Sequence, residues 1–138
     1  MTCYNANDLR FRAECDSATI QNAINATREG SCRAVVIPRY NERTGESRWV
    51  IDKTLLLPND ITVYLDDCVL TLADDVYENI FRNELAFTEA ALLPENEQHG
   101  IRIIGLGNAV LDGGKDNGLR EQNWTPDQPM PITGCLVM

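Results

Sequence analysis

Short apolar runs separated by polar corners follow one another along most of the chain. Residues 61–65 and 68–72 alternate apolar and polar positions, which is the period of a β-strand with one buried face. The corners that end these runs are Asp-Asp pairs and lack the Asn-Gly or Asp-Gly dipeptide of a tight hairpin. The pattern therefore predicts a chain that keeps winding in one direction around a common core. Further strands are predicted at 33–37, 48–52, 54–57, 101–104, 109–111 and 132–138, and the core is predicted to include Ile61, Val63, Leu65, Leu70 and Leu72.

One helix is predicted between Asp16 and Gly30. Asp16 is a favourable N-cap residue and Gly30 a favourable C-cap residue. Between them, one narrow apolar stripe falls at helical spacing, made by Ile20, Ala23, Ile24 and Thr27. Residues 1–15 are predicted to be irregular, apart from a short strand at 9–13.

Three segments interrupt the strand pattern. A short helical turn is expected within residues 76–86, around Ile80, Phe81 and Leu85. Residues 89–98 are acidic and contain a proline, which predicts an excursion over the surface. Residues 112–131 form a second polar segment, and the apolar run 132–138 follows it.

Four segments carry a resemblance to a known family. DSATIQNAI (16–24), AVVIP (34–38) and LLLPNDITVYL (55–65) resemble the N-terminal portion of pectin-lyase-like right-handed parallel β-helix proteins. IRIIGLGNAVLDG (101–113) is similar to an early coil of glycoside hydrolase family 28, the polygalacturonase family. The resemblance implies an all-β fold in which residues 16–138 form an N-terminal capping α-helix and the first coils of a parallel β-helix solenoid.

The same resemblance implies hydrolysis of uronic-acid-containing poly- or oligosaccharides without a cofactor. Family members use an inverting mechanism, in which two carboxyl groups about 6.5–9.5 Å apart flank the scissile bond. The chain has no Asn-Thr-Asp or Arg-Ile-Lys segment, and its Asp-Asp pairs stand in other contexts. No catalytic residue is therefore assigned, and this chain alone is expected to be inactive, with the catalytic coils beyond Met138.

Two alternatives remain open at this point. One is a non-catalytic β-helix module that binds carbohydrate or serves in assembly. The other is a pectate-lyase-type enzyme, which would need Ca²⁺ and a basic residue to abstract a proton. The fold is shared by all three classes, so it does not decide between them.

Several residues suggest chemistry when taken in isolation. The pairs 66–67 and 74–75 place two carboxylates side by side, but their positions after apolar runs favour a structural role at corners. His99 is the only histidine, and QHGIRI (98–103) is similar to the family's later Gly-His-Gly-Ile-Ser-Ile motif. The position of His99 just before the early-coil segment is the wrong place for that later motif, so His99 is predicted to be a loop residue.

Gly105 and Gly107 follow an apolar run, as in a dinucleotide-binding loop. That site needs a helix to start at the second glycine, so that its N-terminus faces the pyrophosphate. The following residues, 110–118, are rich in glycine and aspartate, which do not sustain a helix. A corner between two strands is therefore the favoured interpretation.

Trp124 and Arg120 are the candidate substrate-binding residues. They lie in the polar segment 112–131, where an indole ring can stack on a sugar and a guanidinium can pair with a uronate. Arg48 and Trp49 offer the same groups, but Trp49 falls within a predicted strand and is interpreted as structural.

The acidic composition narrows the classes of partner. A net charge of −9 argues against nucleic acid and against an anionic membrane surface, which leaves carbohydrate as the expected partner.

The five cysteines are scattered without a Cys-x-x-Cys motif, which indicates reduced thiols and no metal site. There is no signal peptide and no apolar run of membrane-spanning length, so a cytoplasmic location is expected. The run 132–138 ends without a cap, which predicts a truncated solenoid and self-association through that end.

Overall fold

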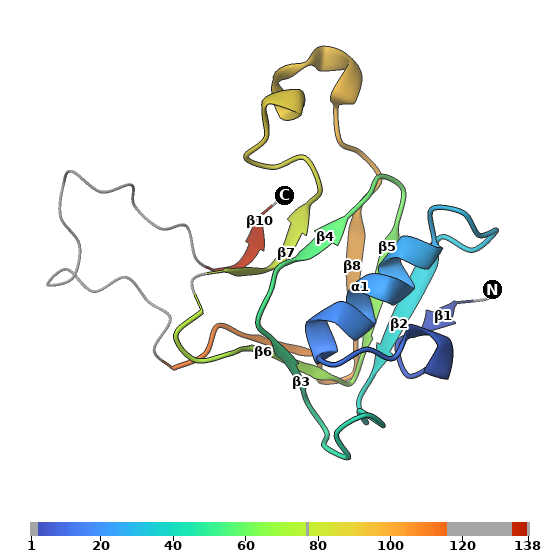
Figure 1. Cartoon of the computed structure of the whole chain (residues 1–138), viewed down its shortest axis with the longest axis vertical. Coiled ribbons are helices and arrows are strands. Elements are labelled where there is room, and N and C mark those ends of the chain that lie inside the picture. The colour runs from blue at the N-terminus through green and yellow to red at the C-terminus, as the bar shows by residue number, and fades with distance from the viewer. Residues whose placement is uncertain (1–2, 77, 116–133, 138) are drawn as a thin grey trace, which may run out of the picture.

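The computed structural model describes residues 3–76, 78–115 and 134–137, and these are rich in parallel β-strands (Figure 1). The strands are short, and one α-helix and three brief 3-10 helices accompany them. The elements are β1 (Tyr4–Asn5), η1 (Leu9–Phe11), α1 (Asp16–Ala26), β2 (Ala34–Pro38), β3 (Trp49–Ile51), β4 (Leu55–Leu57), β5 (Thr62–Asp66), β6 (Val69–Leu72), β7 (Asn79–Asn83), η2 (Glu89–Leu92), η3 (Pro94–Asn96), β8 (Arg102–Leu106), β9 (Val110–Asp112) and β10 (Gly134–Val137).

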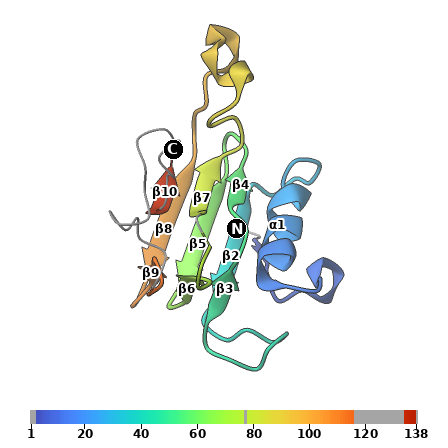
Figure 2. The ribbon, with the colours of Figure 1, turned by 60° about the vertical axis from the view of Figure 1, so that its left-hand side comes forward.

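The strands form three sheets, and every strand pair in them is parallel. The sheet orders are β1-β2-β5-β8, β3-β6-β9 and β4-β7-β10. From β2 onward, the chain visits the three sheets in the same order three times, and each passage is called a circuit here: β2-β3-β4, β5-β6-β7 and β8-β9-β10. Figure 2 shows the circuits side by side, with α1 next to the first. The prediction of a β-rich chain of parallel strands is confirmed.

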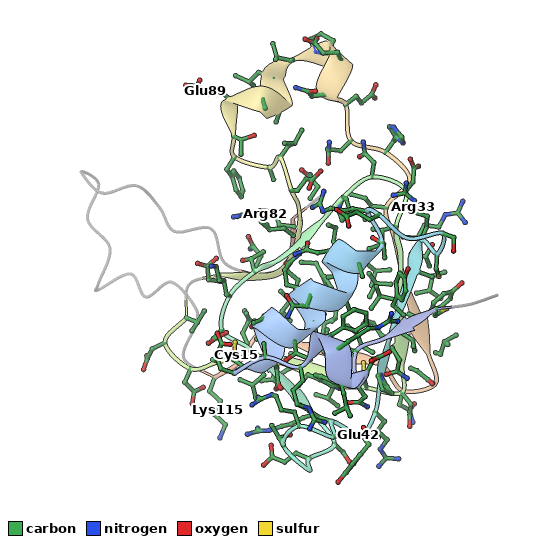
Figure 3. All side chains as sticks on the ribbon, turned by 45° about the vertical axis from the view of Figure 1, so that its right-hand side comes forward. Cys15, Arg33, Glu42, Arg82, Glu89 and Lys115 are labelled. Carbon is green, nitrogen blue, oxygen red and sulfur yellow. The ribbon has the colours of Figure 1, made fainter. Side chains whose placement is uncertain are left out.

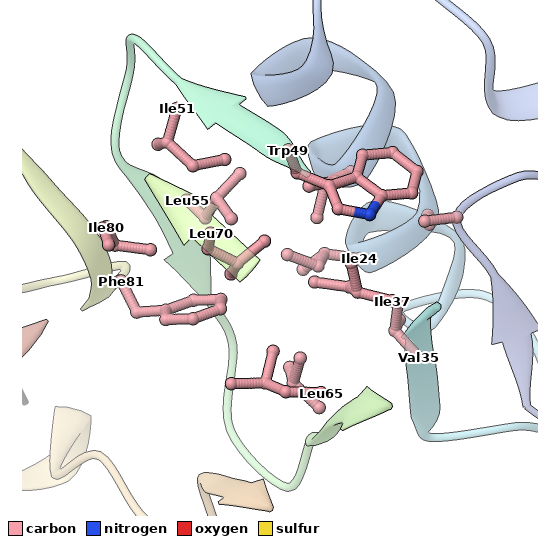
Figure 4. Packing of buried hydrophobic residues seen from close by; sticks show 14 of the residues in the cluster. Ile24, Val35, Ile37, Trp49, Ile51, Leu55, Leu65, Leu70, Ile80 and Phe81 are labelled. Carbon is pink, nitrogen blue, oxygen red and sulfur yellow. The ribbon is translucent and has the colours of Figure 1, made fainter. Parts of the chain in front are cut away.

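The core lies between the three sheets and under α1. Alternate residues of the strands point inward, as in β5, where Val63 and Leu65 are buried and Tyr64 between them is only half-buried. The five residues predicted for the core are all buried. Figure 4 shows the side chains of strands from different circuits meeting in one cluster, including Trp49, Leu70 and Phe81.

Left-handed backbone conformations recur at matching corners of the second and third circuits. Asp60 (φ 59°) precedes β5, and Gly100 (φ 70°) occupies the equivalent position before β8. Asp67 (φ 53°) follows β5, and Gly107 (φ 65°) follows β8. Aspartate and glycine are among the residues that adopt this conformation most readily. A Cβ on Gly100 would collide with the Asp60 carboxylate, which adds to the preference of this left-handed position for glycine.

The first turn of α1 covers the outer edge of β3 with a buried carboxylate. Asp16 accepts a hydrogen bond from the backbone N–H of Val50 at 2.8 Å, so it satisfies a donor at the strand edge. Its other oxygen accepts hydrogen bonds from Asn41 at 2.9 Å and from the Arg43 guanidinium at 2.7 Å. Only 2% of Asp16 is exposed, so these bonds compensate for the loss of water around its charge.

Ser17 and Gln21 of α1 do the same around the start of β4. The Ser17 hydroxyl accepts hydrogen bonds from the N–H groups of Asp52 and Lys53. The side-chain amide of Gln21 accepts from the Leu56 N–H at 2.8 Å and donates to the Leu56 carbonyl at 3.1 Å, as a neighbouring strand would. The helix therefore closes the first circuit through side-chain hydrogen bonds as well as through its apolar stripe.

The ends of α1 differ from the prediction. The N-cap is Cys15, whose sulfur accepts a hydrogen bond from the Ala18 N–H at 3.4 Å; Asp16 is the first helical residue, because its carboxylate is used at β3. The regular helix ends at Ala26, before the predicted cap. Gly30 is needed for a different reason, since the Tyr4 side chain lies where a Cβ would stand.

Two predictions of local structure were wrong. Residues 9–13 were expected to include a strand, but Leu9–Phe11 is the 3-10 helix η1, capped by the Asp8 carboxylate, and the strand of this segment is β1, which pairs with β2. The helical turn expected around Ile80 and Phe81 is the strand β7. Pairing with β4 and β10 fixes β7 as a strand although its buried residues do not alternate.

Candidate functional site

A groove of about 740 Å³ runs between α1 and the segments that flank β4 and β7, and is called the α1 groove here. Polar side chains of α1 form one wall, and the corner leading into β4 forms the other. Ser17 and Gln21, which form hydrogen bonds to the first circuit, therefore also line the α1 groove. Its charged lining residues are Glu14, Arg28, Asp52, Lys53, Glu78 and Glu84.

Two of the four carboxylates in the α1 groove have structural partners. Glu84 forms an ion pair with Arg28, which links the end of α1 to the residue after β7. Glu78 accepts a hydrogen bond from the Thr54 hydroxyl at 2.8 Å, and that hydroxyl accepts one from the Asn79 N–H. These contacts hold the second circuit against the first.

The remaining carboxylates, on Glu14 and Asp52, belong to exposed residues. Glycoside hydrolysis requires one carboxyl group that stays protonated and a second that activates water or attacks, and the first is usually kept protonated by burial. Glu14 and Asp52 lack that environment. The α1 groove presents hydrogen-bonding groups suited to a polar, hydroxyl-rich ligand, without such a pair among the residues described.

The Asp-Asp pairs serve at corners, as the structural interpretation predicted. Asp67 adopts φ 53°, accepts a hydrogen bond from the Asn108 N–H at 3.0 Å and lies 3.6 Å from the Arg39 guanidinium. Asp75 likewise adopts a left-handed conformation, with φ 60°. Asp67 therefore links the second circuit to the third.

The glycine segment is not a dinucleotide site. Gly105 lies within β8, and only Gly107 stands at the corner, with φ 65°. The strand β9 begins at Val110, so no helix N-terminus is available to face a pyrophosphate. The corner interpretation is confirmed for Gly107 and corrected for Gly105.

His99 and Trp49 take the structural roles that were predicted. His99 is an exposed loop residue whose Nδ1 lies 3.1 Å from the Asp60 carboxylate. Trp49 is completely buried, and its indole N–H donates to the Pro38 carbonyl at 2.8 Å. Its ring is therefore not available to stack on a sugar. Trp124 and Arg120, the candidate substrate-binding residues, lie outside the described residues.

Cys3, Cys15 and Cys68 are free thiols that are not joined in disulfides. Burial, with smaller contributions from Asp66 and Asp67, raises the pKa of Cys68 to about 12, so this thiol stays protonated and is not a nucleophile near neutral pH. No group of three or more His, Cys, Asp or Glu side chains suited to a metal ion occurs in the described ranges.

Sequence reasoning missed two features. The first is the use of Asp16, Ser17 and Gln21 to close strand edges; their signal is a row of polar residues beside the narrow apolar stripe of the helix. The second is a hollow of about 590 Å³ in the excursion between β7 and β8, lined by apolar residues that include Phe87 and Leu92. Its signal is a cluster of large apolar residues inside an acidic segment.

Searches of protein-family models, curated proteins and solved structures find no match to this chain. Among the helices described, none has the length and apolar character needed to cross a membrane. The winding of the strands, the two hollows and the sequence resemblance are therefore the features that bear on function.

Proposed function

We propose that the chain forms the N-terminal cap and first coils of a right-handed parallel β-helix. The strongest support is the threefold passage of the chain through the same three sheets, with neighbouring circuits in parallel register. The paired left-handed corners, Asp60 with Gly100 and Asp67 with Gly107, add support because they repeat at one spacing. On this proposal α1 is the end cap.

The whole protein is proposed to be a polygalacturonase-like glycoside hydrolase that acts on uronic-acid-containing poly- or oligosaccharides. The resemblance of the four segments between residues 16 and 113 supports this class. The structural roles of Asp67, Glu78 and Glu84 support the further proposal that this chain is a catalytically silent scaffold, with catalytic carboxylates supplied by coils beyond Met138.

A second candidate is a module that binds carbohydrate without cleaving it. The observation that favours it is the α1 groove, which combines amide, hydroxyl and carboxylate groups without a buried acid–base pair in the part of the chain described. On this alternative an oligosaccharide would lie along α1. A pectate-lyase-type activity is a third possibility, marked by a requirement for Ca²⁺.

One experiment separates these classes. Turnover of polygalacturonate is measured for this chain and for the product of the complete reading frame that contains it. Reducing ends and unsaturated uronates are followed separately, with and without Ca²⁺. The expected result is release of reducing ends without unsaturated products by the complete product, and no turnover by this chain.

Each other outcome points to a different class. Turnover by this chain alone would overturn the silent-scaffold proposal. Unsaturated products that depend on Ca²⁺ would favour the lyase. Binding of oligogalacturonides without turnover would favour the carbohydrate-binding module, and loss of that binding in Asn25→Ala, with Asn108→Ala as the control, would place it in the α1 groove.

A further inference from the structure

The connection between β7 and β8 is much longer than its counterpart in the preceding circuit. It runs over residues 84–101, whereas the same corner between β4 and β5 takes only residues 58–61. Residues 84–98, called the lobe here, carry the short helices η2 and η3 and project beyond the ends of the strands (Figure 1). Because the short corner suffices to connect the sheets, winding of the chain does not require the lobe.

The lobe exposes large apolar side chains. Phe87 is 61% exposed, Leu92 82% and Leu93 47%, and all three line the hollow of about 590 Å³. No lobe residue belongs to the hydrophobic core cluster. The lobe therefore contributes little to the stability of the core, and its exposed apolar residues lie together around one concave surface, as at sites that contact another molecule.

The backbone of the lobe holds Phe87 in an unfavourable conformation. Its φ is 65°, in the left-handed region, which is rare for a bulky residue other than glycine. The Arg82 guanidinium lies 5.4 Å from the centre of the Phe87 ring. A glycine would fit this backbone with less strain, but it would lack the ring that lines the hollow.

The lobe is acidic, and one of its glutamates, Glu97, lines the hollow. The lobe has no lysine or arginine, and three of its four glutamates, Glu89, Glu95 and Glu97, form no ion pair with any residue that the structure describes. The side-chain oxygen of Gln98, which lines the hollow, is buried and accepts no hydrogen bond from the described residues. The hollow of the lobe therefore combines apolar side chains with nearby carboxylates and with the Gln98 side-chain oxygen, a hydrogen-bond acceptor without a donor among the residues described.

We propose that the lobe docks a basic amphipathic segment of a partner protein. Apolar side chains of that segment would enter the hollow beside Phe87 and Leu92, and its lysine or arginine residues would face the glutamates and Gln98. Charge complementarity argues against the other occupants. Two lobes would bring their uncompensated carboxylates together, and an anionic lipid or nucleic acid would be repelled.

The experiment uses the whole chain and a synthetic amphipathic helix of leucine and lysine as the probe, with binding followed by fluorescence anisotropy. A peptide with glutamate in place of lysine is the charge control. The lysine peptide is expected to bind, with an affinity that falls as salt is added, whereas the glutamate peptide is expected not to bind. Phe87→Gly and Leu92→Asp are each expected to weaken binding by about ten-fold or more, as buried anchors of an interface do.

Matched variants separate docking from folding and from general charge. Leu9→Asp changes a leucine that is 71% exposed outside the lobe and is expected to leave binding unchanged. Glu89→Gln is expected to weaken binding, whereas Glu42→Gln, which is distant from the lobe in Figure 3, is not. Phe87→Gly is expected to keep the urea midpoint of the parent chain, because it removes a strained residue without touching the core.

Several outcomes would overturn the proposal. Equal binding of both peptides, no binding of the lysine peptide, or equal losses in Leu9→Asp and Leu92→Asp would each do so. Self-association of the chain that disappears in Leu92→Asp would also overturn it, because the occupant would then be a second copy.

Discussion

The two ends of the strand stack are finished in different ways. At the first circuit, α1 supplies Asp16, Ser17 and Gln21 to hydrogen-bonding groups on the edges of β3 and β4. At the third circuit, β8 and β9 have no strand on their outer side within the described ranges, and Leu106 and Val110 are 43% and 45% exposed. The comparison shows one strand edge covered by the side chains of a helix and another left exposed, which is the arrangement that favours association with a further strand.

The difference extends to the apolar residues of equivalent strands. In the first sheet, Val35 on β2 and Val63 on β5 are completely buried, whereas Ile103, their counterpart on β8, is only half-buried. The same register position is therefore buried in the first two circuits and partly exposed to solvent in the third. Covering Ile103 would recover apolar burial worth about 25 cal/mol for each Å² removed from water.

Removing the Asp16 carboxylate should have the largest effect on the capped end. In Asp16→Ala the Arg43 guanidinium, the Asn41 amide and the Val50 N–H lose their shared partner. We expect a loss of about 3–5 kcal/mol in the free energy of unfolding, as for one partner removed from a buried ion pair. Urea unfolding followed by circular dichroism measures it, and Asp74→Ala at an exposed corner is the control. A loss of unfolding free energy no larger than that of Asp74→Ala would show that the edge of β3 does not need the Asp16 carboxylate.

Gln21 tests the second contact of the cap. Gln21→Ala leaves the N–H and carbonyl of Leu56 without their side-chain partner, so we expect a loss of about 1–3 kcal/mol in unfolding free energy. Hydrogen exchange of the Leu56 amide should accelerate more than that of amides in β5. Glu29→Ala, on an exposed part of the segment after the helix, is the matched control. Unchanged exchange at Leu56 would contradict a strand-like role for the Gln21 amide.

The open end is predicted to associate with another copy when the chain is studied alone. Leu106→Lys with Val110→Lys should reduce that association, because charge on an edge strand disfavours further pairing. Unfolding free energy should change by less than about 0.5 kcal/mol per substitution, since these are exposed positions. Light scattering over a range of concentrations measures the association, and Leu9→Lys is the control. A parent chain that stays monomeric at every concentration would refute this expectation.

At the N-cap of α1, the expected effect is a small gain in stability. The Cys15 sulfur is a weak acceptor, and Cys15→Ser would place a stronger one before the Ala18 N–H. We expect a gain of about 0.5–1 kcal/mol in unfolding free energy, at the scale of a typical N-cap. Thermal unfolding checks it, with Cys32→Ser as the control. A loss of stability would indicate that packing of the sulfur outweighs its role as a cap.

The repeating part of the fold was largely predictable. The strands β5 and β6 alternate clearly, and Asp-Asp pairs end them, so their limits were found to within one residue. Tertiary pairing decided the less regular elements. Ile80 and Phe81 are adjacent and both buried, which breaks the period of two, and pairing of β7 with β4 and β10 identifies them as strand residues.

The contacts of the candidate sites could not be found by the same reasoning. A sequence shows that Asp16 suits a helix start, but not that a strand edge from Val50 lies beside it. Residues 89–98 of the lobe were predicted as a surface excursion, and η2 and η3 bear this out because they contain no buried residue. Its hollow depends on how Phe87 and Leu92 converge, which a local pattern does not contain.

The corner pairs have a consequence for insertions. Asp60 donates its N–H to the carbonyl of His99, and Asp67 does so to Leu106, so both ends of β8 are fixed to the circuit below. The alignment of the third circuit is thus set by these corners, whatever the length of chain between β7 and Gly100. Segments of other lengths and sequences could therefore replace the lobe without shifting the strands that follow, which makes this corner a natural place for new binding surfaces to arise or to be grafted.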